Sequence, residues 1–298
     1  MEALFAPFEV VFVQRALWGG ILVSLICALA GTWVVLRGMA FLGDAMSHGM
    51  LPGVALASIL GGNLFVGAAA AAAAMALGVT ALERWSPRLS RDTGIGLLFV
   101  GMLSAGVIIV SHSGSFAVDL TGFLFGDVLA VREQDLVLLA AALLAALAIA
   151  VPGHRAFTAL AFDPRKATTL GLAPRFAHAA MLGLVTLAVV ASFHVVGTLL
   201  VFGLLIAPPA AAAVWARSIP GIMLGAALLG TASTVAGLLV SWHWGTAAGA
   251  SISACAVALF FASVALHRLG SGPARGRRRT PPADPPAPLP VDERSNAS

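Results

Sequence analysis

The sequence predicts an all-α fold, a polytopic membrane bundle of about eight or nine transmembrane helices. Of its 298 residues 59% are hydrophobic and only 10% are charged, and the mean hydropathy of +0.97 is far above that of a soluble domain. Several windows almost free of charge reach the roughly 20 residues that a helix needs to cross a hydrocarbon core of about 30 Å. Because water cannot satisfy backbone groups there, these windows should be helical.

Basic residues gather in alternate connections between the apolar windows. Three clusters share this arrangement: Arg84, Arg88 and Arg91; Arg155, Arg165, Lys166 and Arg175; and Arg268, Arg275, Arg277, Arg278 and Arg279. Cytoplasmic loops carry such an excess of bases, so the N-terminus is predicted outside and the C-terminus inside. The sequence pI of about 10.4 therefore reports orientation in the lipid bilayer and does not indicate a nucleic-acid partner.

Nine spans follow from the apolar windows and the loop charges. They are predicted at 16–36, 44–60, 63–82, 93–111, 133–152, 176–196, 197–216, 219–241 and 246–267.

The first window is predicted to be an uncleaved helix and not a signal peptide, because Glu2 and Glu9 precede it and no base comes before Arg15. Two pairs of windows meet without a polar loop, at Gly61-Gly62 and at Gly197. Those glycines are either turns or packing glycines. An arrangement of eight spans and one re-entrant segment therefore stays open.

The chain divides into three parts. Residues 1–15 form a short N-terminal segment, and residues 16–267 form one transmembrane domain rich in alanine and glycine, as close helix packing in lipid requires. Residues 268–298 are basic and rich in proline, with no apolar period. This part cannot bury enough surface to fold and is predicted to be a disordered cytoplasmic tail.

The stretch "GDAMSHGMLPG" places Asp44 and His48 four residues apart in the second predicted span. At helical spacing both side chains project from one face. Ionisable groups inside a membrane are costly and usually line the bundle interior or a water-filled path. Carboxylate oxygen suits Mn²⁺ and imidazole nitrogen suits Zn²⁺, so the pair is half of a metal site. A two-fold dimer would supply four ligands.

Two other interpretations of the pair stay open. Asp44 would N-cap the second helix behind Gly43, with His48 hydrogen-bonded to it. Alternatively, the pair would relay protons in a secondary transporter. If the helix is straight, His48 lies about 22 Å below the outer end, in the inner half of the bilayer, unless Pro52-Gly53 breaks the helix.

Three further segments carry candidate functional residues. In "LAFDPRKATTLGL", residues 160–172, Asp163 and Pro164 predict a short surface helix that either docks a soluble partner or is an ordinary loop helix. Successive prolines, Pro208 and Pro209, should kink or unwind the seventh span, either to line a pathway or only for packing. The remaining pathway candidates are Asp119, Asp127 and His194.

Missing motifs exclude several enzyme classes. A Walker A loop needs Gly-Lys before Ser or Thr, and the single lysine, Lys166, follows Arg165. The chain is therefore predicted to transport without an ATPase site of its own. No HExxH motif is present, which argues against a zinc metalloprotease. An intramembrane serine hydrolase using Ser111-His112 or Ser115 lacks a nucleophile-elbow motif but stays open as an alternative.

Four stretches in order, "RGMAFLGDAMSHGMLPGVALA", "DLTGFLFGDVL", "LAFDPRKATTLGL" and "VVGTLLVFGLLIAPPAAAA", resemble the permease subunits of ABC transporters that import zinc, manganese or iron. The resemblance covers about 16–267. It implies a bacterial inner-membrane protein that forms a homodimer, binds two copies of a cytoplasmic ATP-binding subunit and receives metal from an extracytoplasmic solute-binding protein.

The same resemblance assigns roles residue by residue. It implies that Asp44 and His48 coordinate metal, and that an ATPase-coupling loop falls at 162–171, with Phe162, Asp163, Pro164, Arg165 and Gly171. Relatives often carry an acidic residue and a proline near the start of the last span, where this chain has Gly245 and Ala247. We predict Zn²⁺ as the transported substrate, with Mn²⁺ or Fe²⁺ as alternatives, and no tightly bound cofactor.

Overall fold

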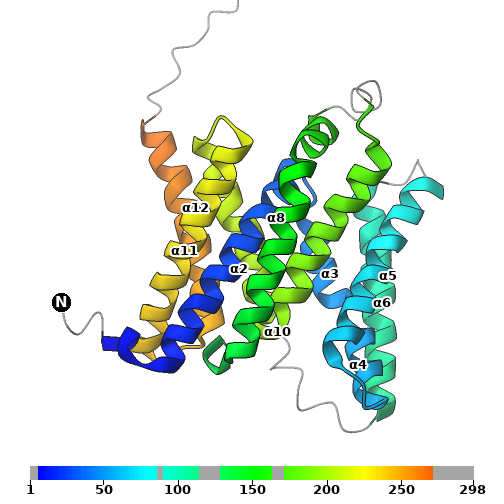
Figure 1. The fold of residues 1–298 in the computed structure, drawn as a ribbon, viewed down its shortest axis with the longest axis horizontal. Helices are drawn as coiled ribbons and strands as arrows, with labels where there is room; N and C mark the ends of the chain where they lie inside the picture. The colour runs from blue at the N-terminus through cyan, green and yellow to red at the C-terminus, as the bar shows by residue number, and fades with distance from the viewer. Residues whose placement is uncertain (1–5, 86–89, 114–127, 163–170, 271–298) are drawn as a thin grey trace, which may run out of the picture.

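Helices account for nearly all of the described chain in the computed structural model (Figure 1), which describes residues 6–85, 90–113, 128–162 and 171–270. The elements are η1 (Ala6–Glu9), α2 (Val11–Leu36), α3 (Ala40–Gly49), α4 (Leu51–Ile59), α5 (Leu64–Trp85), α6 (Arg91–Ser113), η3 (Val128–Ala130), α8 (Glu133–Phe162), α10 (Pro174–Trp215), α11 (Ile219–Trp244) and α12 (Ala248–Gly270). No strand occurs in the described residues, which confirms the all-α prediction.

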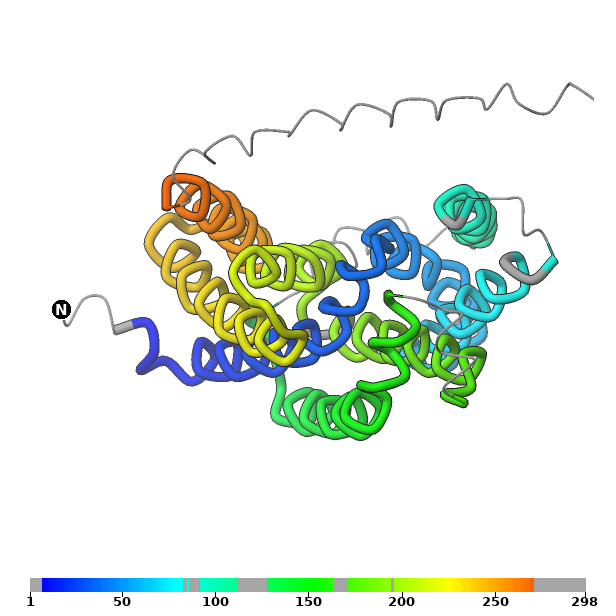
Figure 2. Tube along the Cα trace, turned by 90° about the horizontal axis from the view of Figure 1, so that it is seen from above, coloured from blue at the N-terminus to red at the C-terminus, as the bar shows by residue number. Residues whose placement is uncertain are grey.

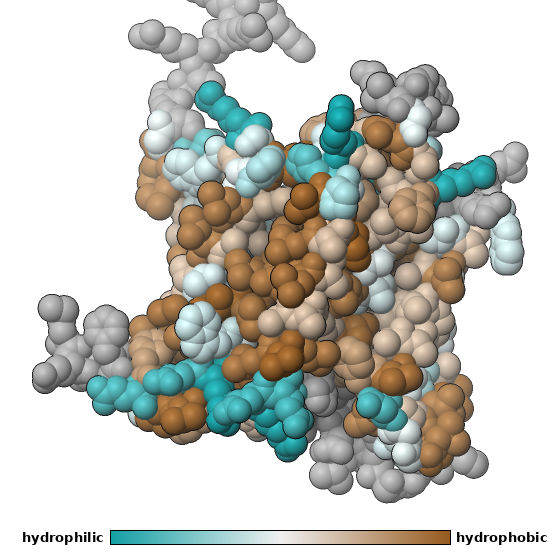
Figure 3. Space-filling view, viewed as in Figure 1, coloured by the Kyte–Doolittle hydropathy of each residue, from teal (hydrophilic) through white to brown (hydrophobic). Residues whose placement is uncertain are grey.

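Eight helical segments within the described residues are long and apolar enough to cross a membrane. The short helices α3 and α4 together cross the same thickness from one face to the other (Figure 1), so the described part of the chain makes nine passes. Polar side chains gather at the two ends of the bundle, and a broad apolar band lies between them (Figure 3). The molecule is therefore a polytopic membrane bundle, as the sequence predicted.

The second span is broken at Met50, between α3 and α4. Pro52 has no N–H to donate to the carbonyl of His48. The amides of Gly53 and Val54 both donate instead to the carbonyl of Met50, each at 3.1 Å. The helix also starts earlier than predicted, at Ala40 and not at residue 44.

Helix α10 contains two membrane passes that are separated by a reversal at Gly197. The φ of 76° and ψ of 164° at Gly197 are non-helical. Both ends of α10 lie at the face where α2 and α12 end (Figure 1): Arg37 Nη1 lies 3.0 Å from His178 Nδ1, and Trp215 Nε1 donates to Ser263 Oγ at 2.7 Å. Gly197 is thus the turn between two predicted spans.

We call this end of the bundle the basic face, since its exposed arginines include Arg155, Arg175, Arg217 and Arg268. The other end, where α2 begins, mixes both charges, with Arg15 Nη2 bonded to Glu133 Oε1 at 2.7 Å. The positive-inside rule predicts that the basic face is cytoplasmic.

Replacing Gly197 by alanine is expected to destabilise the protein by about 1–3 kcal/mol, because these dihedral angles fall in a region that is essentially restricted to glycine. The midpoint of thermal unfolding in detergent measures the effect. Gly183→Ala is the matched control, since Gly183 lies in the same helix and a Cβ there would have no atom within 4 Å. Equal midpoints for the two variants would contradict the prediction.

Helices α8 and α10 both continue through prolines. Helix α8 extends ten residues beyond Pro152, the residue at which the fifth predicted span ends. Pro208 and Pro209 do not unwind the helix, because the only non-helical dihedral angles within α10 are at Gly197. A proline in a helix removes one hydrogen bond, and tertiary packing offsets that loss.

Helix α2 forms the centre of the bundle and packs on α8, α10 and α11 (Figure 2). Close approach to α10 depends on Gly31, where a Cβ would occupy the position of the Leu205 backbone carbonyl. Pro209 has no N–H for that carbonyl, which lies four residues before it. The freed carbonyl thus lies against a glycine, and the two helices meet through their backbones.

Candidate metal site

The candidate site is formed by Asp44 and His48 on α3. The Nε2 atom of His48 lies 3.5 Å from Oδ1 of Asp44, and the side chains are 28% and 33% exposed, respectively. The predicted i, i+4 arrangement on one helix face is therefore confirmed. Both side chains keep access to the outside of this single chain, which a ligand for a passing ion requires.

The rest of α3 is packed tightly into the bundle. Between the two site residues, Ala45, Met46 and Ser47 are buried, and Ser47 Oγ donates to the carbonyl of Gly43 at 2.9 Å. Helix α3 contacts α5, α6 and α10. Because the intervening residues are anchored in this way, the backbone that carries the carboxylate and the imidazole is held in position.

An aromatic ring lies against the imidazole, and a second ring packs on the first. The Phe99 ring of α6 lies edge-on to His48, with 5.9 Å between ring centroids, and Phe41 packs on Phe99 at 5.7 Å. Phe99 is eight residues from the start of α6, which corresponds to about 12 Å of helix from the basic face.

The N-cap interpretation of Asp44 is wrong. Helix α3 begins at Ala40, and its N-cap residue is Met39. Asp44 therefore lies in the second turn, where backbone amides already donate within the helix and a carboxylate has no capping role.

Within the described residues, one copy of the chain supplies only part of a metal site. The described residues contain no group of three or more His, Cys, Asp or Glu side chains that could hold a metal ion. Asp44 and His48 offer one oxygen donor group and one nitrogen donor, whereas zinc in proteins takes four ligands and manganese up to six.

The structure brings the proline segment of α10 next to α3. A Cβ added to Gly43 would lie 2.7 Å from Cδ2 of Leu205, so α10 passes beside Asp44 about one turn before Pro208 and Pro209. Sequence spacing alone did not indicate this neighbour. The backbone of His194 lies three residues before the Gly197 turn, and its side chain is outside the described part.

The remaining predicted site residues fall mostly outside the described residues. These are Asp119, Asp127, Asp163, Pro164 and Arg165. Phe162 ends α8 with 74% of its surface exposed. Gly171 has φ of 68° and precedes α10.

Sequence reasoning missed one pair of residues near this segment. Arg37 follows α2, and its Nη1 lies 3.0 Å from Nδ1 of His178 in the second turn of α10. The pair joins the end of the central helix to the helix that follows residues 163–170. No sequence motif links two residues that are 141 positions apart.

Gly245 and Ala247, where relatives often carry an acidic residue and a proline, lie away from α3. Gly245 has φ of 64° and ends α11, and Ala247 is exposed in the turn before α12. The nearby ring of His243 has Nδ1 at 2.8 Å from the carbonyl of Leu239 in its own helix.

Ser111, a candidate nucleophile of the serine-hydrolase alternative, donates its hydroxyl hydrogen to the carbonyl of Ile108 at 2.9 Å.

A model of the ABC 3 transport family matches residues 9–267. The chain belongs to the ABC 3 transport family.

Several relatives of this ABC 3 permease have names that specify a metal. It is 35% identical over 250 residues to the manganese transport system membrane protein MntC of Listeria innocua, covering 84% of this chain and 89% of that protein. It is 34% identical over 266 residues to the probable iron transport system membrane protein of Haemophilus influenzae, covering 89% and 97%.

Among solved structures, the permease resembles PsaBC from Streptococcus pneumoniae in complex with Fab. The TM-score is 0.77 at 32% identity, with 88% of this chain and 95% of that chain covered. Together, the family and the bundle identify a multi-pass permease of a metal-importing ABC transporter in the bacterial cell membrane.

Proposed function

We propose that this permease imports Mn²⁺ through a site formed by Asp44 and His48 from two copies of the chain. The observation that carries the proposal is the Nε2–Oδ1 distance of 3.5 Å on a partly exposed helix face. The two side chains are close enough to bind one ion together. A two-fold dimer that brings two such pairs to its axis completes a set of two nitrogen and two carboxylate ligands.

The ligand chemistry is consistent with this cargo. Carboxylate suits Mn²⁺, and imidazole also suits iron and zinc. The names of the relatives from Listeria innocua and Haemophilus influenzae specify manganese and iron. The Zn²⁺ that we predicted from the sequence is the competing cargo for the same ligands.

The proposed mechanism is alternating access. A separate ATP-binding subunit, in two copies, drives the change, because this chain has no Walker A motif. The segment between Phe162 and Gly171 would receive the motion, and the Arg37–His178 contact would pass it from α10 to α2. An extracytoplasmic solute-binding protein would deliver the ion, and the site would bind it weakly enough for release.

Metal uptake into proteoliposomes tests the proposal. The vesicles hold the permease with its ATP-binding subunit, and they receive the loaded binding protein with ⁵⁴Mn, ⁵⁵Fe or ⁶⁵Zn. We expect ATP-dependent uptake in which the initial rate for manganese exceeds that for zinc by at least about tenfold.

Each other outcome has a defined meaning. Faster uptake of zinc than of manganese would show that zinc is the transported metal, and the proposed transport function would stand. Uptake driven by a proton gradient without the ATP-binding subunit would contradict the proposed mechanism and favour the proton-relay alternative.

A further inference from the structure

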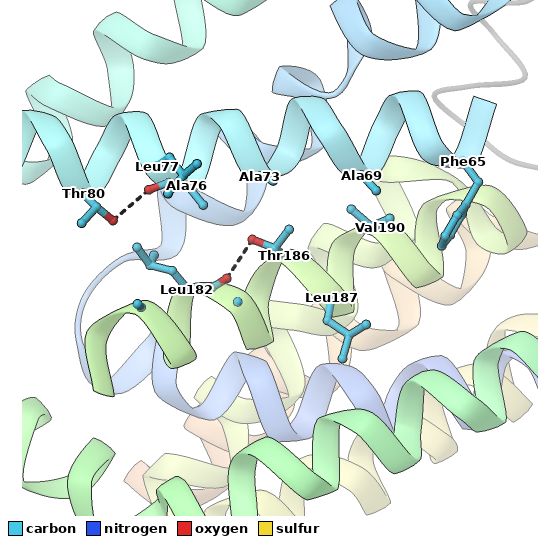
Figure 4. A pocket seen from close by; sticks show the side chains of 12 residues that line it. Phe65, Ala69, Ala73, Ala76, Leu77, Thr80, Leu182, Thr186, Leu187 and Val190 are labelled. Carbon is cyan, nitrogen blue, oxygen red and sulfur yellow. Dashed lines mark hydrogen bonds between the residues drawn. The ribbon is translucent and has the colours of Figure 1, made fainter. Parts of the chain in front are cut away.

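A groove of about 480 Å³ runs between α5 and the first half of α10. Its walls come from Phe65 to Thr80 on α5 and from Ala179 to Val190 on α10 (Figure 4). Both wall segments belong to membrane-crossing helices. The groove contains no residue of α3, so it is separate from the candidate metal site.

The groove offers no free polar group to an occupant. Its two polar side chains are Thr80 and Thr186, and both hydroxyls donate to carbonyls of their own helices (Figure 4), at 2.9 Å to Ala76 and at 2.8 Å to Leu182. A polar ligand would lose its hydrogen bonds to water and gain none here. The occupant must therefore be hydrocarbon.

The length of the groove suits an acyl chain. Phe65 and Thr80 are 15 residues apart on α5, which corresponds to about 22 Å of helix. Half of the hydrocarbon core is about 15 Å thick. A lipid with its headgroup at the basic face can therefore lay one whole chain along the groove.

The α10 wall leads directly to a cationic side chain at the basic face. Ala179, Gly183 and Thr186 recur at helical spacing, and Arg175 continues this stripe one turn toward the helix start. Arg175 is exposed and makes no ion pair within the described part of the chain. A phosphate at this level would lie within reach of the Arg175 guanidinium.

Exposed aromatic rings mark the same level as the membrane interface. Phe176 follows Arg175 and is 76% exposed, and Trp85 at the end of α5 is 82% exposed. Tryptophan side chains such as Trp85 concentrate where hydrocarbon meets headgroups. Arg175 therefore lies at the level where lipid headgroups are expected.

We infer that this groove binds one acyl chain of an anionic phospholipid from the leaflet at the basic face, with the headgroup phosphate on Arg175. Gly183 leaves space for the acyl chain, because a Cβ at this position would have no atom within 4 Å. The inference depends on the membrane fold and not on the identity of the transported metal.

Native mass spectrometry of the delipidated full-length chain tests the inference. Phosphatidylglycerol and phosphatidylcholine with the same acyl chains are added back separately. The wild type should bind phosphatidylglycerol more tightly. Arg175→Gln should weaken phosphatidylglycerol binding about fivefold and leave phosphatidylcholine unchanged, because one base near an anionic lipid contributes that much.

Gly183→Leu should weaken the binding of both lipids more than tenfold, since its side chain fills the groove. Arg217→Gln and Gly101→Leu are the matched controls: Arg217 is an exposed arginine of the basic face away from the groove, and Gly101 is an exposed α6 glycine with equally open space. The controls should bind lipid as the wild type does.

Three results would overturn the inference. Lipid binding unaffected by Gly183→Leu would exclude the groove. If Arg175→Gln weakened the binding of both lipids equally, the proposed contact between the headgroup phosphate and Arg175 would be contradicted. A shift of Gly183→Leu from dimer to monomer in the same spectra, with lipid binding retained, would show that a second copy of the chain fills the groove.

Discussion

His48→Ala is expected to reduce ATP-driven metal uptake by more than about a hundredfold, and Asp44→Asn by a similar factor. Loss of a residue that only orients a metal ligand typically costs 10–100-fold, and these substitutions remove ligands themselves. In a two-fold dimer each substitution eliminates two of the four ligands at once. The initial rate of ⁵⁴Mn uptake in proteoliposomes measures the effect.

These substitutions should leave the fold intact. An i, i+4 ion pair contributes about 0.3–0.5 kcal/mol, and both site side chains are partly exposed. Yield and thermal midpoint should therefore match the wild type, which separates lost transport from lost protein.

Two substitutions of the same chemistry serve as controls for the site. His243→Ala removes an exposed imidazole whose Nδ1 lies 2.8 Å from the carbonyl of Leu239 in its own helix. Asp92→Asn removes an exposed carboxylate at the start of α6. Both controls should keep normal uptake. Normal uptake by both His48→Ala and Asp44→Asn would refute the metal site.

Gly31→Ala is expected to destabilise the bundle by about 3 kcal/mol, at the upper end of the cost of overpacking. The new methyl group would overlap the backbone carbonyl of Leu205 and lie 3.0 Å from Cγ of Pro209. Neither group is the flexible end of a side chain, so α2 and α10 must separate. Because α2 is the central helix, the packing of α8 and α11 would be disturbed as well.

Thermal unfolding in detergent, together with the yield of folded protein, measures this effect. Gly101→Ala is the matched control, because it adds the same methyl group at a helix position where no atom lies within 4 Å of the new Cβ. Alanine is the better helix former by up to about 1 kcal/mol, so the control should be neutral or slightly stabilised. Equal midpoints for Gly31→Ala and wild type would contradict the backbone contact between α2 and α10.

Much of the fold could be predicted from local patterns. Helices α5, α6, α11 and α12 begin and end within three residues of the predicted spans, because the hydrophobic thickness of a membrane fixes the length of an apolar helix. The shared face of Asp44 and His48 also followed from sequence, since the geometry of one helical turn is local.

Errors arose where a local rule competed with packing. Pro208-Pro209 suggested a kink or unwinding, yet the backbone dihedral angles at these residues stay helical. The cost of a missing hydrogen bond depends on what surrounds the freed carbonyl, and for Leu205 that neighbour is Gly31 on a different helix. Such a contact cannot be inferred from neighbouring residues in sequence.

The sequence by itself determined that this is a membrane bundle, that its basic loops alternate, and that an acid and a histidine share one helix face. These properties depend on composition and on spacing within a few residues. Only the tertiary structure decided that Phe99 lies against His48, that Arg37 meets His178, and that α5 and α10 leave a groove between them. Those contacts join residues far apart in the chain, and their positions depend on how whole helices pack.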